Sequence, residues 1–86
     1  MIKKLTKDIS EILNYKVDLT VTDKGINIYK KHMFHGISLD LNFYRNGKVL
    51  FYKADLKAME LKQIMLLIDI FFQDFYKEKS WYRNIR

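Results

Sequence analysis

Residues 55–79, DLKAMELKQIMLLIDIFFQDFYKEK, decide the fold, because they predict one long helix that no proline or glycine interrupts. We expect Asp55 to be its N-cap, since a carboxylate there can accept hydrogen bonds from the free backbone N–H groups of the first turn. Lys77 and Lys79 suit the other end, where their charge opposes the negative end of the helix dipole. Successive residues point about 100° apart around a helix, and on that spacing one broad face is apolar and should lie in the core. The residues of this face are Leu61, Ile64, Leu67, Ile68, Phe71, Phe72 and Phe75.

The opposite side of the same helix carries a second apolar stripe, formed by Met59, Leu66 and Ile70 beside the charged Lys62 and Asp69. An isolated surface helix gains nothing by exposing three large apolar side chains, so we expect a partner on this stripe. That partner is another protein, a second copy of the chain, or the N-terminal helix or C-terminal tail of the same chain. Asp69 either limits aggregation as a solvated charge or contacts a basic group of the partner.

In the N-terminal half, the spacing of the apolar residues changes from helical to strand-like. Residues 2–14 place apolar side chains at spacings of three and four, which predicts a short amphipathic helix. Residues 15–22 and 26–31 alternate with period two and predict half-buried strands, joined by a two-residue turn at residues 24–25.

A second hairpin follows. Residues 37–44 alternate in the same way and run into Asn46-Gly47, a pair that favours a type I′ turn because both residues tolerate a positive φ. The two predicted registers pair Val21 with Ile28, Asp18 with Lys31, Phe43 with Leu50, Leu41 with Tyr52, and Asp40 with Lys53.

The elements therefore follow the order α-β-β-β-β-α within one domain, residues 1–86. We predict an α+β two-layer sandwich, a four-stranded antiparallel sheet with both helices on one face. The register turns Tyr44, Val49 and Phe51 to the other face of the sheet, together with Tyr29 and Thr20. A two-layer fold leaves that face open, so the back of the sheet and the back of the long helix are both candidate binding surfaces.

Composition limits the partners. The formal net charge of +6 favours acidic partners, and the absence of cysteine removes disulfide and thiolate chemistry. The N-terminus lacks the features of a signal peptide, and the longest apolar run, residues 64–72, is too short to span a bilayer. We expect a cytoplasmic protein with no membrane partner.

Abundant Lys, Ile, Asn, Tyr and Phe indicate an AT-rich gene, as in phages and mobile elements whose products act in the host cytoplasm.

Catalytic residues are few. His32 and His35 have a spacing at which two imidazoles can reach one metal ion, but the sequence marks no third ligand. The chain also lacks the glycine-rich loop that binds phosphates, so we expect no enzyme activity, no metal and no cofactor. A general-base role for His35 beside a basic sheet would resemble the small toxin ribonucleases of the double-stranded-RNA-binding fold. That likeness is one of topology and carries no motif.

The sequence favours a small non-enzymatic protein-binding module. We expect a homodimer that serves as an accessory or inhibitor protein of phage or mobile-element type and occupies a surface of a larger target. The expected partner-binding residues are Tyr44, Val49, Phe51, Met59, Leu66, Ile70, Trp81, Arg83 and Arg86.

The alternative is a small basic nucleic-acid-binding protein. Its lysines cluster near the N-terminus and at the end of the second strand, and its C-terminal tail adds Trp81 and Tyr82 as stacking groups beside bases that bind phosphate. The basic residues of these clusters are Lys3, Lys4, Lys7, Lys30, Lys31, Lys77, Lys79, Arg83 and Arg86. Whether they converge on one face depends on the fold.

Overall fold

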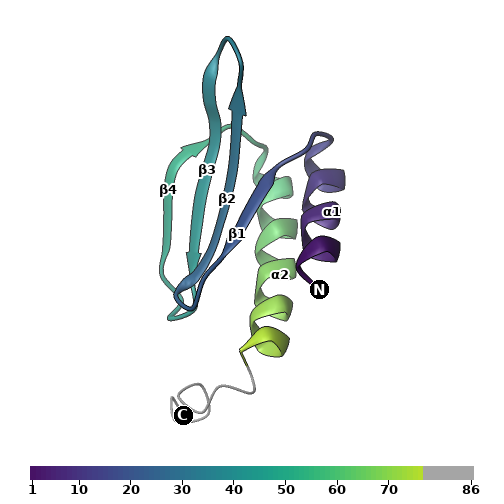
Figure 1. Ribbon diagram of the computed structural model, residues 1–86, viewed down its shortest axis with the longest axis vertical. Helices are drawn as coiled ribbons and strands as arrows, with labels where there is room; N and C mark the ends of the chain where they lie inside the picture. The colour runs from purple at the N-terminus through teal and green to yellow at the C-terminus, as the bar shows by residue number, and fades with distance from the viewer. Residues whose placement is uncertain (77–86) are drawn as a thin grey trace.

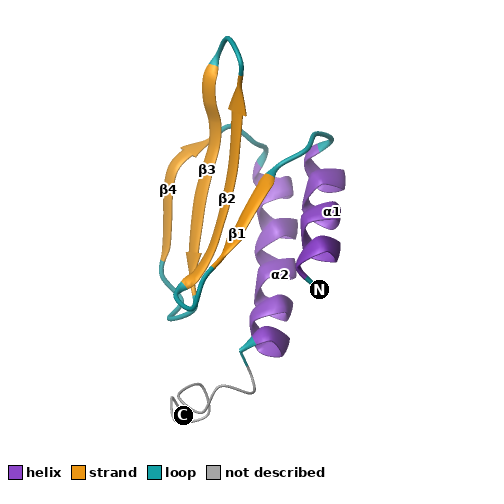
Figure 2. Cartoon of the chain, in the orientation of Figure 1, coloured by secondary structure: helices purple, strands orange, loops and turns teal. Residues whose placement is uncertain are grey.

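The computed structural model describes residues 1–76, in which four strands form one antiparallel sheet and two helices cover one of its faces (Figures 1 and 2). The elements are α1 (Ile2–Leu13), β1 (Asp18–Val21), β2 (Gly25–His32), β3 (Gly36–Tyr44), β4 (Val49–Ala54) and α2 (Ala58–Phe75). The strands are neighbours in the order of the sequence, β1-β2-β3-β4. The predicted α-β-β-β-β-α order and the α+β architecture are confirmed.

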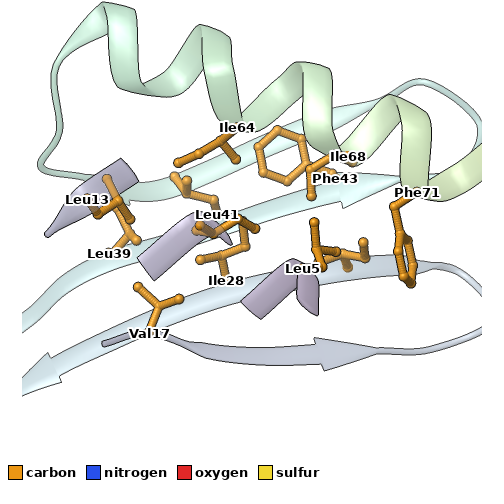
Figure 3. Close-up of a cluster of buried hydrophobic side chains, with 12 residues drawn as sticks. Leu5, Leu13, Val17, Ile28, Leu39, Leu41, Phe43, Ile64, Ile68 and Phe71 are labelled. Atoms are coloured by element: carbon orange, nitrogen blue, oxygen red, sulfur yellow. The ribbon is translucent and has the colours of Figure 1, made fainter. Parts of the chain in front are cut away.

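The core lies between the sheet and the two helices (Figure 3). Ile64, Ile68 and Phe71 of α2 are buried there, and the other residues of the predicted core face pack against it at partial exposure. The helix α1 and the strands contribute the rest, at the positions that the two periodicities predict. These are Leu5, Ile9, Leu13, Val17, Ile26, Ile28, Leu39, Leu41 and Phe43.

The long helix begins at Ala58, so the prediction that Asp55 is its N-cap is wrong. The backbone N–H of Asp55 donates to the carbonyl oxygen of Ser38, which ties this residue to the sheet. The N-cap is Lys57, whose backbone N–H donates to the Glu60 carboxylate at 2.7 Å. Glu60 thus supplies the negative charge at the helix N-terminus that was expected from Asp55. The predicted C-terminal residues Lys77 and Lys79 lie outside the described residues.

The register of the first hairpin differs from the prediction by two residues. Val21 pairs with Ile26 and Asp18 with Tyr29, so the predicted pairs of Val21 with Ile28 and Asp18 with Lys31 are wrong. The turn is one step earlier than expected, because Gly25 belongs to β2. A Cβ atom on Gly25 would lie 2.2 Å from the carbonyl oxygen of Phe43, so glycine is required by the close approach of β3. A shift of two residues keeps every side chain on its predicted face.

The second hairpin turns through three residues, 45–47. The N–H of Gly47 donates to the carbonyl oxygen of Tyr44 at 2.9 Å, and the N–H of Tyr44 donates to that of Lys48 at 2.8 Å. Gly47 has a positive φ of 96°, whereas Asn46 does not, so the predicted type I′ turn is wrong.

The three-residue turn moves part of β4 by one position. Phe43 pairs with Val49 and Leu41 with Phe51, in place of the predicted Leu50 and Tyr52. A bulge beside Asp40 and Leu41 then restores the predicted pair of Asp40 with Lys53.

A shift of one residue exchanges the two faces of a strand, so Val49 and Phe51 lie on the helix side of the sheet. Phe51 is partly buried against the core and meets the ring of Phe43 edge to face, with the centroids 5.6 Å apart. The prediction that Val49 and Phe51 lie on the open face is therefore wrong. Tyr44 alternates with the buried Phe43 and stays on the open face.

Candidate protein-binding surface

The outer side of α2 exposes the apolar stripe that the sequence predicts. Met59, Leu66 and Ile70 are 72%, 60% and 58% exposed, although α1 packs beside α2 (Figure 1). Exposure of three large apolar side chains on one helix face is unusual for a monomer of this size. The neighbouring helix therefore leaves the stripe open.

On one flank the stripe continues into a groove between the two helices, which run in opposite directions (Figure 1). Leu66 and Ile70 line this groove opposite Ile12, in a depression of about 540 Å³. Its rim is acidic, since Asp8 and Glu11 of α1 also line it. Asp8 is partly neutralised by Lys4, whose Nζ lies 3.1 Å from its carboxylate.

On the other flank α2 faces β4. Val49 and Met65 line a cleft of about 270 Å³ together with Asp69 of α2, and they are 43% and 40% exposed. The corrected register thus adds Val49 to the helix side of the sheet. Met65 was missed because, at 100° per residue, it lies at the border between the core face of α2 and the outer stripe. We call Val49, Met59, Met65, Leu66 and Ile70 the α2 surface.

The open face of the sheet carries a polar network. The side-chain amide of Asn27 donates to the carboxylate of Asp40 at 2.9 Å and to the carbonyl oxygen of the Asn42 side chain at 3.0 Å. Asn42 donates in turn to the backbone carbonyl of Leu50 at 3.4 Å. Val49 and Phe51 leave this face, and the one-residue shift brings the partly buried Leu50, the partner of Asn42, onto it beside Tyr44. The α2 surface is therefore the stronger candidate.

The hairpin of β2 and β3 projects beyond the rest of the sheet (Figure 1). Its tip places Met33 and Phe34 in solvent, each 87% exposed. The rings of His32 and His35 flank them with centroids 6.4 Å apart. Among residues 1–76, no group of three or more His, Cys, Asp or Glu side chains is placed to hold a metal ion.

Several of the predicted lysine clusters come together. Lys3 and Lys7 line one groove with Lys16, and Lys30 lies above the ring of Tyr15 in the same region. Lys4 pairs instead with Asp8. The predicted partner residues Trp81, Arg83 and Arg86 lie outside the described residues, as do Lys77, Lys79 and Tyr82.

Comparison with protein-family models, with curated proteins and with solved structures finds no match. Neither helix among residues 1–76 has the length and apolar character needed to cross a membrane. The geometry of the surfaces is therefore the basis for a functional proposal.

Proposed function

We propose that the chain is a small non-enzymatic protein-binding module that works through the α2 surface. The observation that supports this proposal is the exposure of Met59, Leu66 and Ile70 along one side of the central helix. Such a stripe is typical of a surface that becomes buried in a complex.

The occupant that fits best is a second copy of the same chain. Lys62 and Asp69 lie on the same flank of the stripe, before and after Leu66 in the sequence. If two α2 helices pack in opposite directions about a two-fold axis near Leu66, Lys62 of each copy lies beside Asp69 of the other. Isologous interfaces have this self-complementary character.

The expected affinity follows from the burial. Complete burial of a large apolar side chain contributes about 1.5 to 3 kcal/mol, so the half-exposed side chains of the stripe contribute about 3 to 5 kcal/mol from each copy. Two copies contribute about 6 to 10 kcal/mol, which is of the same order as the roughly 4 to 15 kcal/mol that association costs. Because the gain and the cost are of similar size, we expect a weak dimer whose population rises with protein concentration.

A dimer of this kind has the helices in its middle and the sheets outside. The polar faces of both sheets and both projecting hairpins stay accessible. An accessory or inhibitor role on a larger macromolecular target would use these outer faces, with lysines directing the encounter toward an acidic surface.

The proposal is tested by sedimentation equilibrium over a concentration series at low and high salt. The wild-type chain should form a dimer that persists at high salt, because apolar burial is not screened. Leu66→Glu should give a monomer with an unchanged circular dichroism spectrum. Tyr52→Glu is the matched control, since Tyr52 is 70% exposed on β4 and should leave the dimer intact. A monomer at every concentration, or a dimer that survives Leu66→Glu, would contradict the proposal.

A further inference from the structure

A basic groove follows the outer face of α1, away from the α2 surface. It has a volume of about 600 Å³ and is lined by Lys3, Lys7 and Lys16, with Glu11 as its single acidic lining residue. Lys3 and Lys7 are four residues apart and share one face of the helix.

The fold brings Lys16 to the same groove. Asn14 ends α1 in the left-handed conformation, with φ of 64°, and this turns the chain back along the helix. The hydroxyl oxygen of Ser10 then accepts a 3.3 Å hydrogen bond from the backbone N–H of Val17. This contact holds the returning segment, and with it Lys16, against α1.

Tyr15 connects the groove to the projecting hairpin. It lines the groove, Lys30 Nζ lies 5.9 Å from its ring centroid, and the ring of His32 lies 6.5 Å from it. Beyond His32 the hairpin ends in the exposed Phe34. No acidic residue occurs between residues 24 and 39, so this part of the hairpin, up to and including its tip, carries only positive charge.

We propose that this basic band, which consists of Lys3, Lys7, Lys16 and Lys30 with the exposed rings of His32 and Phe34, binds single-stranded nucleic acid. The partly buried Tyr15 joins the groove to the hairpin. Lysines bind phosphates as point charges without reading bases, and exposed aromatic rings stack on bases of any sequence. The two are combined here along a line from the N-terminal turn of α1 to the hairpin tip.

The length of the band favours a polyanionic strand over an anionic membrane. A protein that inserts one apolar tip into a membrane needs its cations close around that tip. Lys3 instead lies near the N-terminus, at the end of α1 that points away from the tip (Figure 1). A linear polyanion is therefore the better fit, and the arrangement leaves the α2 surface free for a second copy.

The test is fluorescence anisotropy of a labelled oligothymidine strand with the full chain, over a series of salt concentrations. Each lysine that neutralises a phosphate of a single strand contributes about −0.7 to the slope of log K against log salt, so four predict about −3. The double variant Lys3→Gln/Lys7→Gln should reduce this slope by about 1.4. Phe34→Ser should weaken binding by about tenfold and leave the slope unchanged, because stacking is not electrostatic.

The matched control is Lys24→Gln/Lys48→Gln, which removes the same charge from the turns at the opposite end of the sheet. It should leave the slope unchanged, and all variants should keep the circular dichroism spectrum of the wild type. Four outcomes would overturn the proposal. These are no binding at low salt, an equal loss in the control, tighter binding to phosphatidylglycerol vesicles than to the strand, and loss of binding only on Arg83→Gln/Arg86→Gln.

Discussion

The hydroxyl of Tyr76 donates a 2.6 Å hydrogen bond to the backbone carbonyl oxygen of Thr22, which joins the end of α2 to the turn between β1 and β2. The Tyr76 side chain is fully buried, and the guanidinium of Arg45 lies 4.1 Å above its ring. Arg45 also donates to the backbone carbonyl of Asp23. The Tyr76 side chain thus fixes the end of the long helix to both turns at this end of the sheet.

Removing this hydroxyl should destabilise the fold. Tyr76→Phe leaves the Thr22 carbonyl without this donor and should lower the free energy of unfolding by about 1 kcal/mol. Tyr76→Ala also removes the buried ring and should cost about 3 to 5 kcal/mol. Urea denaturation measures both changes. Tyr52→Phe, at an exposed tyrosine, should change nothing, and an equal effect of Tyr52→Phe and Tyr76→Phe would contradict the role of the hydrogen bond.

The same tyrosine should make stability depend on alkaline pH. Burial raises the pKa of the Tyr76 hydroxyl above its usual value of 10.0, although the nearby Arg45 lowers it in part. The unfolded chain therefore loses this proton first as the pH rises. The contribution of Tyr76 is complete below about pH 10 and declines above it, because the unfolded state then binds fewer protons than the folded state.

Urea denaturation from pH 8 to pH 11 tests this dependence. The wild type should lose more stability than Tyr76→Phe over the upper part of that range, since the variant has no hydroxyl to ionise. Tyr15 also has a pKa raised by burial, with Asp55 and Glu60 raising it further, and it is present in both proteins. The difference between the two curves therefore isolates Tyr76, and parallel curves would show that its ionisation is not linked to folding.

Two glycines should respond differently to alanine. A Cβ atom at Gly25 would lie 2.2 Å from the carbonyl oxygen of Phe43, so Gly25→Ala must push β2 and β3 apart. We expect a loss of at least about 3 kcal/mol in the free energy of unfolding, as for a severe core clash. Gly36 has a positive φ of 76° and no neighbour within 4 Å of an added Cβ atom. Gly36→Ala should cost only about 1 to 2 kcal/mol of backbone strain. Equal losses would mean that the strands near Gly25 can adjust.

The sequence predicts the architecture because helix and strand periodicities are local, whereas the registers depend on contacts across the sheet. Gly25 has the appearance of a turn residue, but its role is set by Phe43 on another strand. For the second turn, Asn46-Gly47 is compatible with a two-residue type I′ turn, with positive φ at both residues, and with the observed three-residue turn, with positive φ at Gly47 and not at Asn46. The choice between these two turns decided the face of Val49 and Phe51.

The candidate surfaces also contain residues that the local pattern predicts and residues that depend on tertiary contacts. Met59, Leu66 and Ile70 could be predicted because a helical wheel needs no tertiary information. The neighbours that complete the surface could not be, since Val49 reaches α2 only through the corrected register. Tyr76 was missed because its hydrogen-bond partner lies 54 residues away in the chain. The basic band likewise depends on the turn at Asn14, which brings Lys16 back to α1. The spacing of apolar residues does not predict the direction of that turn.

The arrangement of charges around Leu66 gives the sharpest test of the dimer. Lys62→Asp should place two acidic groups side by side at each of two symmetric positions, and Asp69→Lys should do the same with basic groups. Each substitution should weaken dimerisation by about three- to tenfold, the effect of an exposed like-charge contact repeated twice.

The double variant Lys62→Asp/Asp69→Lys restores opposite charges across the two-fold axis and should regain most of the wild-type affinity. Lys24→Asp, which changes the net charge by the same amount as Lys62→Asp but at the far turn, controls for the general effect of net charge on association. Sedimentation equilibrium at low salt measures the dimerisation constants of the wild type and the four variants. If the double variant is as weak as the sum of its single changes, the copies do not pack with Lys62 beside Asp69, and the α2 surface must bind its partner in another orientation.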